Sequence, residues 1–240
     1  SSDVCSSDLK LQAKPLKIQV VPPASPPMPH PWPTIIDAFI AALGSDRVIR
    51  RKEELLVYEC DGLTSYRQRP AVVVLPKSTE QVAAAVRICD RFGVPFVPRG
   101  AGTGLSGGAL PLADSVLIVT ATMTEILEID LENQRVVVQP GVINNWVTQA
   151  VSGAGFYYAP DPSSQSVCSV GGNVAENSGG VHCLKYGVTT NHVLGLTVVL
   201  PDGEIVELGG AVAESPGYDL CGDRKSTRLN SSHLVISYAV

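Results

Sequence analysis

A twelve-residue segment of the chain, PRGAGTGLSGGA (98–109), contains five glycines. Glycine loses more backbone freedom on folding than any other residue, so we expect this segment to form a feature that needs bare backbone. The pattern G-x-G-x-x-G occurs in it at Gly102, Gly104 and Gly107, which is the spacing of dinucleotide-binding loops. The residues around the pattern must decide what the loop holds.

The residues that follow the glycines do not fit the helix-based phosphate sites. In those sites a helix begins after the last glycine, and its N-terminus meets the phosphate. Here Gly108 and Pro111 follow, and the next regular pattern is a strand. We therefore predict a concave nest of backbone N–H groups, which binds anions without a helix. Thr103 and Ser106 would add hydroxyl donors and Arg99 a charge, whereas a surface loop without function is the alternative.

A second segment, DPSSQSVCSVGGNVAENSGG (161–180), is also rich in Gly, Ser and Asn and holds few charges. Ser169 is placed to cap a short helix through residues 173–177. The pair Gly171 and Gly172 would let a ligand approach the backbone closely. Two such segments in one domain indicate a single large ligand with both a phosphate and a flat polar ring, and a flavin dinucleotide fits this description.

Composition and net charge limit the classes of protein to which this chain can belong. Hydrophobic residues make up 45% of the chain and charged residues 17%, which allows a buried core. The net charge is −5 and no long run of Lys or Arg occurs, so we expect no nucleic-acid partner. No apolar run reaches the length of a membrane span, and the first residues lack the pattern of a secretory signal.

The six cysteines are widely spaced, and no C-x-x-C pair occurs. Zinc and iron–sulfur sites use closely spaced cysteines, and disulfide frameworks belong mostly to shorter chains. We therefore predict reduced thiols and no metal site, the neighbouring His182 and Cys183 included.

The N-terminal part of the chain divides into two predicted segments. Residues 10–33 hold eight of the eighteen prolines and are predicted to be an extended linker. Residues 34–69 form a helical and extended segment, whose helix begins at Thr34 and ends at Gly44.

Residues 70–223 are predicted to form one domain. The run AVVVLP (71–76) is typical of a buried strand, an amphipathic helix follows over 78–92, and VPFVP (94–98) is a second strand. This spacing makes a βαβ unit, which favours parallel strands. From SVLIVT onward the second half is mostly strands and turns, so we expect a larger mixed or antiparallel sheet and an α+β fold. The first Gly-rich segment follows the second strand, where ligands of α/β sheets bind.

The two ends of the chain differ in composition from the predicted domain. Residues 1–9 and 224–240 are rich in Ser and lack the Gly and Pro residues that separate the predicted elements in the middle of the chain. Both are similar to translated sequencing-adapter read-through, so we expect them to be artefacts that lie outside the fold.

Several motifs occur in order along the domain: PRGAGTGLSGG, VQPGV (138–142), DPSSQ, SVGGNVAENSGG, KYG (185–187) and LPDG. Together they resemble the FAD-binding domain of the vanillyl-alcohol oxidase/PCMH superfamily. Within it the chain is most similar to the flavin subunits of bacterial glycolate oxidases, on YECDGLTSYRQRPAVVVLP and YYAPDPSSQ. The resemblance covers roughly residues 43–222. It implies a PCMH-type fold of two subdomains, a small βαβ subdomain and a larger mixed or antiparallel sheet with helices.

The resemblance also implies that FAD is the cofactor and which residues bind it. The first segment would wrap the pyrophosphate through Arg99, Gly100, Ala101, Gly102, Thr103, Gly104, Leu105, Ser106 and Gly107. The second would wrap the flavin and ribityl side through Asp161, Ser163, Ser164, Ser169, Gly171, Gly172, Asn173, Ala175 and Asn177. The strand around 192–195 would lie near the adenine end, with Val193 among the cofactor-binding residues.

A protein with this resemblance is expected to oxidise a small 2-hydroxy acid such as glycolate or D-lactate. A hydride would pass from the substrate carbon to flavin N5, and partner subunits, one of them an iron–sulfur protein, would take the electrons. The protein would be cytoplasmic, and any contact with the inner membrane would be made through those partners. A non-catalytic FAD-binding scaffold subunit and a flavin reductase acting on a sugar nucleotide are the alternatives.

No catalytic residue or metal ligand is assigned from the resemblance. After GYDLCG (217–222) the family continues into another Gly-rich flavin motif and then a substrate domain with metal-binding histidines and a carboxylate-binding arginine. This sequence instead continues DRKSTRLNSS. We therefore expect a C-terminally truncated FAD-binding part that is inactive alone.

Overall fold

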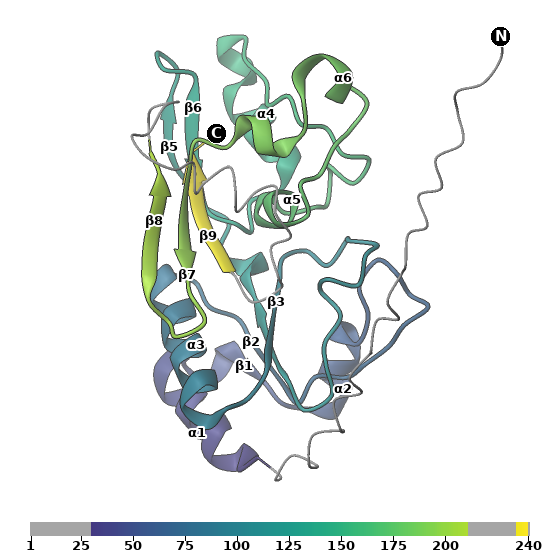
Figure 1. The fold of residues 1–240 in the computed structure, drawn as a ribbon, viewed down its shortest axis with the longest axis vertical. Coiled ribbons are helices and arrows are strands. Elements are labelled where there is room, and N and C mark those ends of the chain that lie inside the picture. The colour runs from purple at the N-terminus through teal and green to yellow at the C-terminus, as the bar shows by residue number, and fades with distance from the viewer. Residues whose placement is uncertain (1–29, 211–233, 240) are drawn as a thin grey trace, which may run out of the picture. The chain divides into compact units, whose positions relative to one another are not determined.

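The computed structural model describes residues 30–210 and the backbone of residues 234–239. The predicted segment 1–9, the linker as far as residue 29, and residues 211–233 lie outside this part of the chain. The described strands form two sheets, one of four strands and one of five (Figure 1).

The first sheet is built from short buried strands in the order β1-β2-β4-β3, in which β2, β4 and β3 run parallel and β1 runs antiparallel to β2. The strands are β1 Val48–Ile49, β2 Val72–Val74, β3 Phe96–Arg99 and β4 Val116–Val119, and the helices packed on them are α1 Trp32–Leu43, α2 Lys52–Leu55 and α3 Thr79–Phe92. The predicted βαβ unit is present as β2, α3 and β3, but β4 lies between its two strands. Strand β4, which the sequence groups with the second half, is buried throughout and therefore suits the middle of a parallel sheet.

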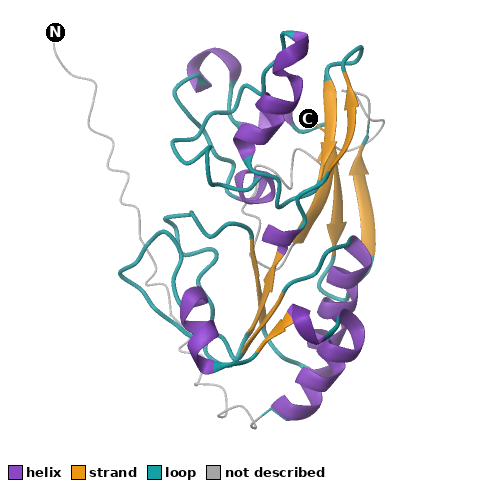
Figure 2. Ribbon diagram, turned by 180° about the vertical axis from the view of Figure 1, so that it is seen from behind, coloured by secondary structure: helices purple, strands orange, loops and turns teal. Residues whose placement is uncertain are grey.

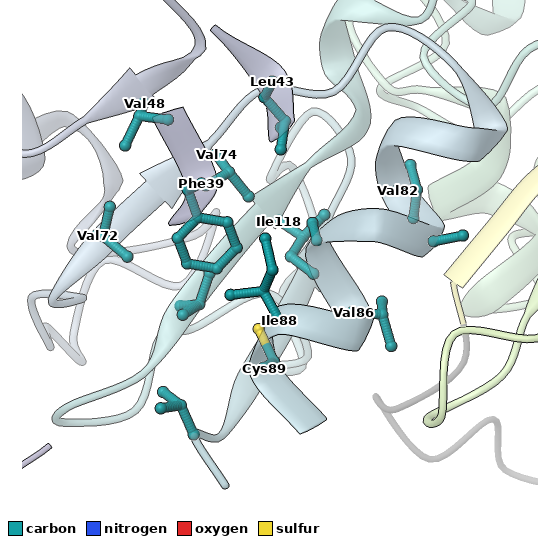
Figure 3. Packing of buried hydrophobic residues seen from close by; sticks show 14 of the residues in the cluster. Phe39, Leu43, Val48, Val72, Val74, Val82, Val86, Ile88, Cys89 and Ile118 are labelled. Atoms are coloured by element: carbon teal, nitrogen blue, oxygen red, sulfur yellow. The ribbon is translucent and has the colours of Figure 1, made fainter. Parts of the chain in front are cut away.

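Both faces of the first sheet are covered, so alternate residues of a strand enter different clusters. Val72 and Val74 face α1 and α3, where the ring of Phe39 lies in the middle of the cluster (Figure 3). Val73 faces the other way and packs with Leu55 of α2. Figure 2 shows α1 and α3 on one side of this sheet and α2 on the other. Each fully buried side chain of this kind contributes roughly 2 kcal/mol through apolar burial.

Local chemistry explains where the two long helices begin and end. Helix α1 begins at Trp32, two residues before the predicted start at Thr34, because Pro33 is tolerated in a first turn, where its missing N–H has no partner to lose. The predicted linker therefore ends before Trp32. Helix α3 begins after Ser78, whose hydroxyl accepts a backbone N–H at 3.3 Å, and ends at Gly93, which has a φ of 62°.

The second sheet has the order β5-β6-β9-β7-β8 and is antiparallel throughout. Its strands are β5 Ile126–Asp130, β6 Arg135–Val138, β7 Gly195–Val199, β8 Ile205–Gly209 and β9 Leu234–Ala239, and the helices beside it are α4 Asn144–Val151, α5 Val170–Ala175 and α6 Cys183–Tyr186. Val138 of β6 is buried with Val147 of α4 and Val174 of α5. Of the two expected arrangements, mixed or antiparallel, the sheet has the antiparallel one.

Strand β9, drawn in yellow in Figure 1, pairs with β6 on one side and β7 on the other. Residues 224–240 are predicted to lie outside the fold, and the structure differs from this prediction for residues 234–239. Strands β6 and β7 each offer unpaired backbone N–H and C=O groups toward the space between them, and a strand inserted there satisfies those groups. The adapter origin of the segment stays a prediction.

Helix α3 of the first sheet contacts the β7–β8 end of the second sheet. Val199, at the end of β7, is buried in the cluster of the first sheet. The guanidinium of Arg87 on α3 donates to the carbonyl oxygen of Gly203 at 2.8 Å. A Cβ at Gly203 would lie 2.9 Å from the carbonyl oxygen of Ala83. The turn between β7 and β8 is therefore fastened directly to α3.

Cys89 of α3 provides a test of this packing. It is one of four free cysteines in the described part of the chain, and burial raises the pKa of its thiol to about 12. At about pH 8 only roughly one Cys89 in 10⁴ is then ionised, so we expect it to stay unmodified during a short iodoacetamide treatment of the native protein. The half-buried Cys60 and Cys183 serve as controls that react. Peptide mass spectrometry gives the readout, and equal labelling of Cys89 and Cys60 would contradict the packing of α3.

Candidate functional site

A cavity of about 370 Å³ lies where the two Gly-rich segments meet. Its walls come from the loop after β3, from Thr120 just after β4, and from the segment that leads into α5. The structure thus brings the two segments together, as the sequence predicts. The predicted residues that line the cavity are Arg99, Gly100, Ala101, Gly102, Thr103, Gly104, Leu105, Ser106, Ser164, Ser169, Gly171, Gly172, Asn173 and Ala175.

One hydrogen bond joins the two walls. The backbone N–H of Ala101 donates to the hydroxyl of Ser169 at 3.1 Å. Ser169 is the N-cap residue of α5, as predicted, but its hydroxyl makes no capping bond to that helix. A Cβ at Gly100 would collide with the same hydroxyl. The close approach of the two segments therefore requires glycine at position 100.

The loop after β3 presents a run of free backbone donors. Within the described chain, none of the N–H groups from Gly102 to Ala109 donates a hydrogen bond to another residue. Gly102 has a φ of 72° and Gly107 a φ of 78°, so the backbone turns through the left-handed region that favours glycine. Consecutive free N–H groups in such a turn form an anion-binding concavity. This backbone arrangement is the one expected of the predicted nest, and its donors would suit the oxygens of a pyrophosphate.

Asn173 offers a further donor from the opposite wall. It lies on α5, is 3% exposed, and lines the cavity. Its side-chain Nδ2 is buried and has no hydrogen-bond partner among the described residues. An unpaired buried amide costs free energy, roughly 1–3 kcal/mol, unless a ligand accepts from it. The cavity therefore fits a ligand with phosphate oxygens and further polar acceptors, as FAD has.

Two charged residues, Arg99 and Glu176, are among those that line the cavity. The Arg99 guanidinium donates to the carbonyl oxygens of Cys60 at 2.7 Å and Ala109 at 3.4 Å. Burial lowers the pKa of Arg99 and the charge of Asp61 opposes this, but a guanidinium stays protonated. Glu176 lies beside Gly108, where it can accept from hydroxyl groups of a ligand. Phosphate oxygens in this cavity would therefore be bound mainly by neutral backbone donors.

Five predicted residues lie outside the lining: Gly107, Asp161, Ser163, Asn177 and Val193. Asp161 instead contacts His182, with 2.6 Å between its Oδ2 and the ring Nδ1. Partial burial of Asp161 opposes ionisation, but the hydrogen bonds from His182 outweigh it and lower the pKa of the carboxyl. The amide oxygen of Asn177 accepts the backbone N–H of Thr190 at 2.9 Å. A cofactor-binding role stays a prediction for these five residues, as it does for the predicted residues that line the cavity.

Some lining residues are missing from the sequence prediction: Pro98, Gly108, Ala109, Thr120, Cys168, Glu176 and Ser178. Most of them are direct neighbours of predicted residues, so a continuous reading of each Gly-rich segment would have found them. Thr120 follows β4, and only the parallel pairing of β4 with β3 reveals that the ends of these strands meet at one edge.

A comparison with known protein families matches residues 70–209 to the family described as FAD binding domain. The chain belongs to this family of FAD-binding domains. The predicted cofactor, FAD, and the resemblance found in the sequence are thereby confirmed.

Two curated relatives show how much of a whole protein the match covers. "Glycolate oxidase subunit GlcD" of Escherichia coli strain K12 is 57% identical over 173 residues, which are 72% of this chain and 35% of that protein. "D-lactate dehydrogenase" of Anaerostipes hadrus is 46% identical over 155 residues, which are 64% of this chain and 32% of that protein. The chain therefore spans about a third of the length of these relatives.

A solved structure supports the fold. The substrate-bound crystal structure of p-cresol methylhydroxylase aligns with a TM-score of 0.74 at 22% identity, over 87% of this chain and 42% of that one. A likeness at this identity establishes the fold alone. The predicted α+β fold of the PCMH type is thereby confirmed.

Gly104 tests the assignment of the nest. A Cβ at Gly104 would meet open space, and the residue lines the cavity without a left-handed φ. We expect Gly104→Val to fold with an unchanged melting temperature but to bind FAD at least tenfold more weakly, because the side chain takes space beside the donors. Flavin fluorescence quenching during reconstitution measures the affinity. Gly153→Val, also at an open position, is the matched control, and wild-type affinity in Gly104→Val would refute the assignment.

Proposed function

We propose that this chain is the FAD-binding part of a flavin-dependent 2-hydroxy-acid dehydrogenase or oxidase of the glycolate or D-lactate type. The cavity, with its run of free N–H donors and the buried amide of Asn173, carries the cofactor part of the proposal. The substrate class is supported by the names of the relatives, glycolate oxidase subunit, D-lactate dehydrogenase and D-2-hydroxyglutarate dehydrogenase.

In this proposal the residues of the chain hold and orient the cofactor. The N–H groups of residues 102–109 would bind the pyrophosphate, and the amide of Asn173 would donate to a polar acceptor of the flavin. Ser169 keeps the two walls together through Ala101. Bound FAD supplies an acceptor for the two electrons that leave a 2-hydroxy acid when it becomes a 2-oxo acid. The walls would exclude water from the cofactor and fix its position for that chemistry.

The groups that bind the substrate carboxylate and take its hydroxyl proton are proposed to come from outside the matched third of the protein. The relatives are about three times as long as the matched region, which leaves room for a substrate domain. Among the described residues, Arg99 is the cation in the cavity wall, and its guanidinium is engaged with backbone carbonyls.

We propose that the electrons pass to partner subunits, one of them an iron–sulfur protein, and that the protein is cytoplasmic with any inner-membrane contact made through those partners. The word "subunit" in the name of the Escherichia coli relative supports an assembly of several chains. Among the described helices, none is long and apolar enough to cross a bilayer.

The full-length protein tests the proposal. We expect it to purify with FAD and its flavin absorbance to bleach anaerobically with glycolate or D-lactate, because these substrates carry a hydroxyl beside the carboxylate. Acetate, which lacks that hydroxyl, is the matched control and should cause no bleaching. Absorption spectra before and after each addition give the result.

Two outcomes would favour the alternatives. A flavin that no 2-hydroxy acid bleaches would indicate a scaffold subunit. Bleaching by a reduced nicotinamide dinucleotide, followed by reoxidation with a sugar nucleotide, would indicate a reductase of the same superfamily. Either outcome contradicts the proposed oxidation.

A further inference from the structure

Asp61 is a buried acidic residue that the proposed function does not use. The sequence pattern around it predicts only a turn with Gly62. Asp61 is 5% exposed, and its Oδ1 accepts the backbone N–H of Leu63 at 2.8 Å. Its Oδ2 is buried and has no hydrogen-bond partner among the described residues. A buried carboxylate is costly unless a nearby charge compensates it.

The turn that contains Asp61 lies directly against the nest. A Cβ at Gly62 would be 2.7 Å from the carbonyl oxygens of both Thr103 and Gly104. These carbonyls belong to the residues that present the free N–H groups. A shift of this turn would therefore move the peptide groups of Thr103 and Gly104 and change the direction in which their N–H groups point.

Arg99 connects the same turn to the nest from the other side. Its guanidinium donates to the carbonyl oxygen of Cys60 at 2.7 Å and lies 5.9 Å from the ring centre of Tyr58. A Cβ at Gly102 would collide with this guanidinium. Burial lowers the pKa of Arg99, and the charge of Asp61 is the largest of the effects that oppose this. Arg99 is thus a half-buried cation held between the turn and the nest, and Asp61 directly follows Cys60, whose carbonyl oxygen the guanidinium binds.

We propose that Asp61 is a positioning residue for the cofactor site, which acts through Arg99. Its carboxylate offsets the charge of the half-buried guanidinium, and the guanidinium together with Gly62 holds residues 102–104 in their concave shape. The inference rests on the assignment of this loop to FAD. It extends the cofactor site to residues 58–63, which precede the family match at residues 70–209.

The test uses the full-length protein with its flavin removed and FAD added back. Asp61→Asn keeps the shape and the acceptor for Leu63 but removes the charge, which leaves the half-buried Arg99 without its neighbouring anion. We expect its dissociation constant for FAD, measured by flavin fluorescence quenching, to rise at least tenfold. Glu59→Gln is the matched control, because Glu59 lies on the same segment and pairs at 2.8 Å with the exposed Arg67. It should bind FAD as the wild type does.

A double-substitution cycle separates positioning from a general loss of stability. If Asp61 acts through Arg99, Asp61→Asn and Arg99→Gln together should weaken FAD binding little more than the stronger single change does. Fold-changes that multiply would overturn the proposal, and so would wild-type affinity in Asp61→Asn.

Gly62→Ala provides a second route if Asp61→Asn does not fold. Its Cβ disturbs the same contact while both charges stay in place, so we expect weaker FAD binding than in Gly153→Ala, whose Cβ meets open space. Equal affinities would overturn the proposal. If the wild type binds FAD but 2-hydroxy acids do not bleach its flavin, the proposed function is refuted. The FAD affinities of the Asp61 variants would still test the role of Asp61, because they do not depend on substrate.

Discussion

The cavity depends on one hydrogen bond, which the backbone of Ala101 donates to the hydroxyl of Ser169. It joins segments that are 68 residues apart in the sequence and that belong to different subdomains. Such a bond contributes only about 1 kcal/mol to stability. Its larger effect is geometric, because it sets the distance between the nest and α5. The absence of a side chain at Gly100 follows from it, and so does the use of Ser169 away from its own helix.

The two charged side chains in the cavity wall do not point to a direct role in binding phosphate. The cation in the cavity wall, Arg99, holds the loop through backbone carbonyls, and the anion, Glu176, lies against the nest at Gly108. In the proposed binding mode, the phosphate contacts would fall to backbone N–H groups, whose direction is fixed by the fold. Backbone donors cannot rotate away as a long side chain can, so they lose little entropy when a ligand binds.

The sequence predicts the two glycine-rich segments, their convergence and the FAD cofactor, because glycine spacing and hydroxyl content are local properties. It does not predict what depends on pairing between distant segments. The place of β4 between β2 and β3 is one example, since a buried apolar run fits any central strand. The role of Asp61 is another, because a turn motif carries no information about the guanidinium that packs on it. The pairing of β9 is a third, since backbone hydrogen bonds accept almost any sequence.

The contact of the β7–β8 turn with α3, through Arg87 and Val199, has a consequence for how the cavity keeps its width. It joins the two sheets through residues outside the cavity lining, whereas the bond between Ala101 and Ser169 joins them within it. Burial of an apolar side chain such as Val199 resists separation of the sheets more strongly than one hydrogen bond does. A substitution at the β7–β8 turn would therefore act on the cavity from a distance, by changing how far apart its two walls stand.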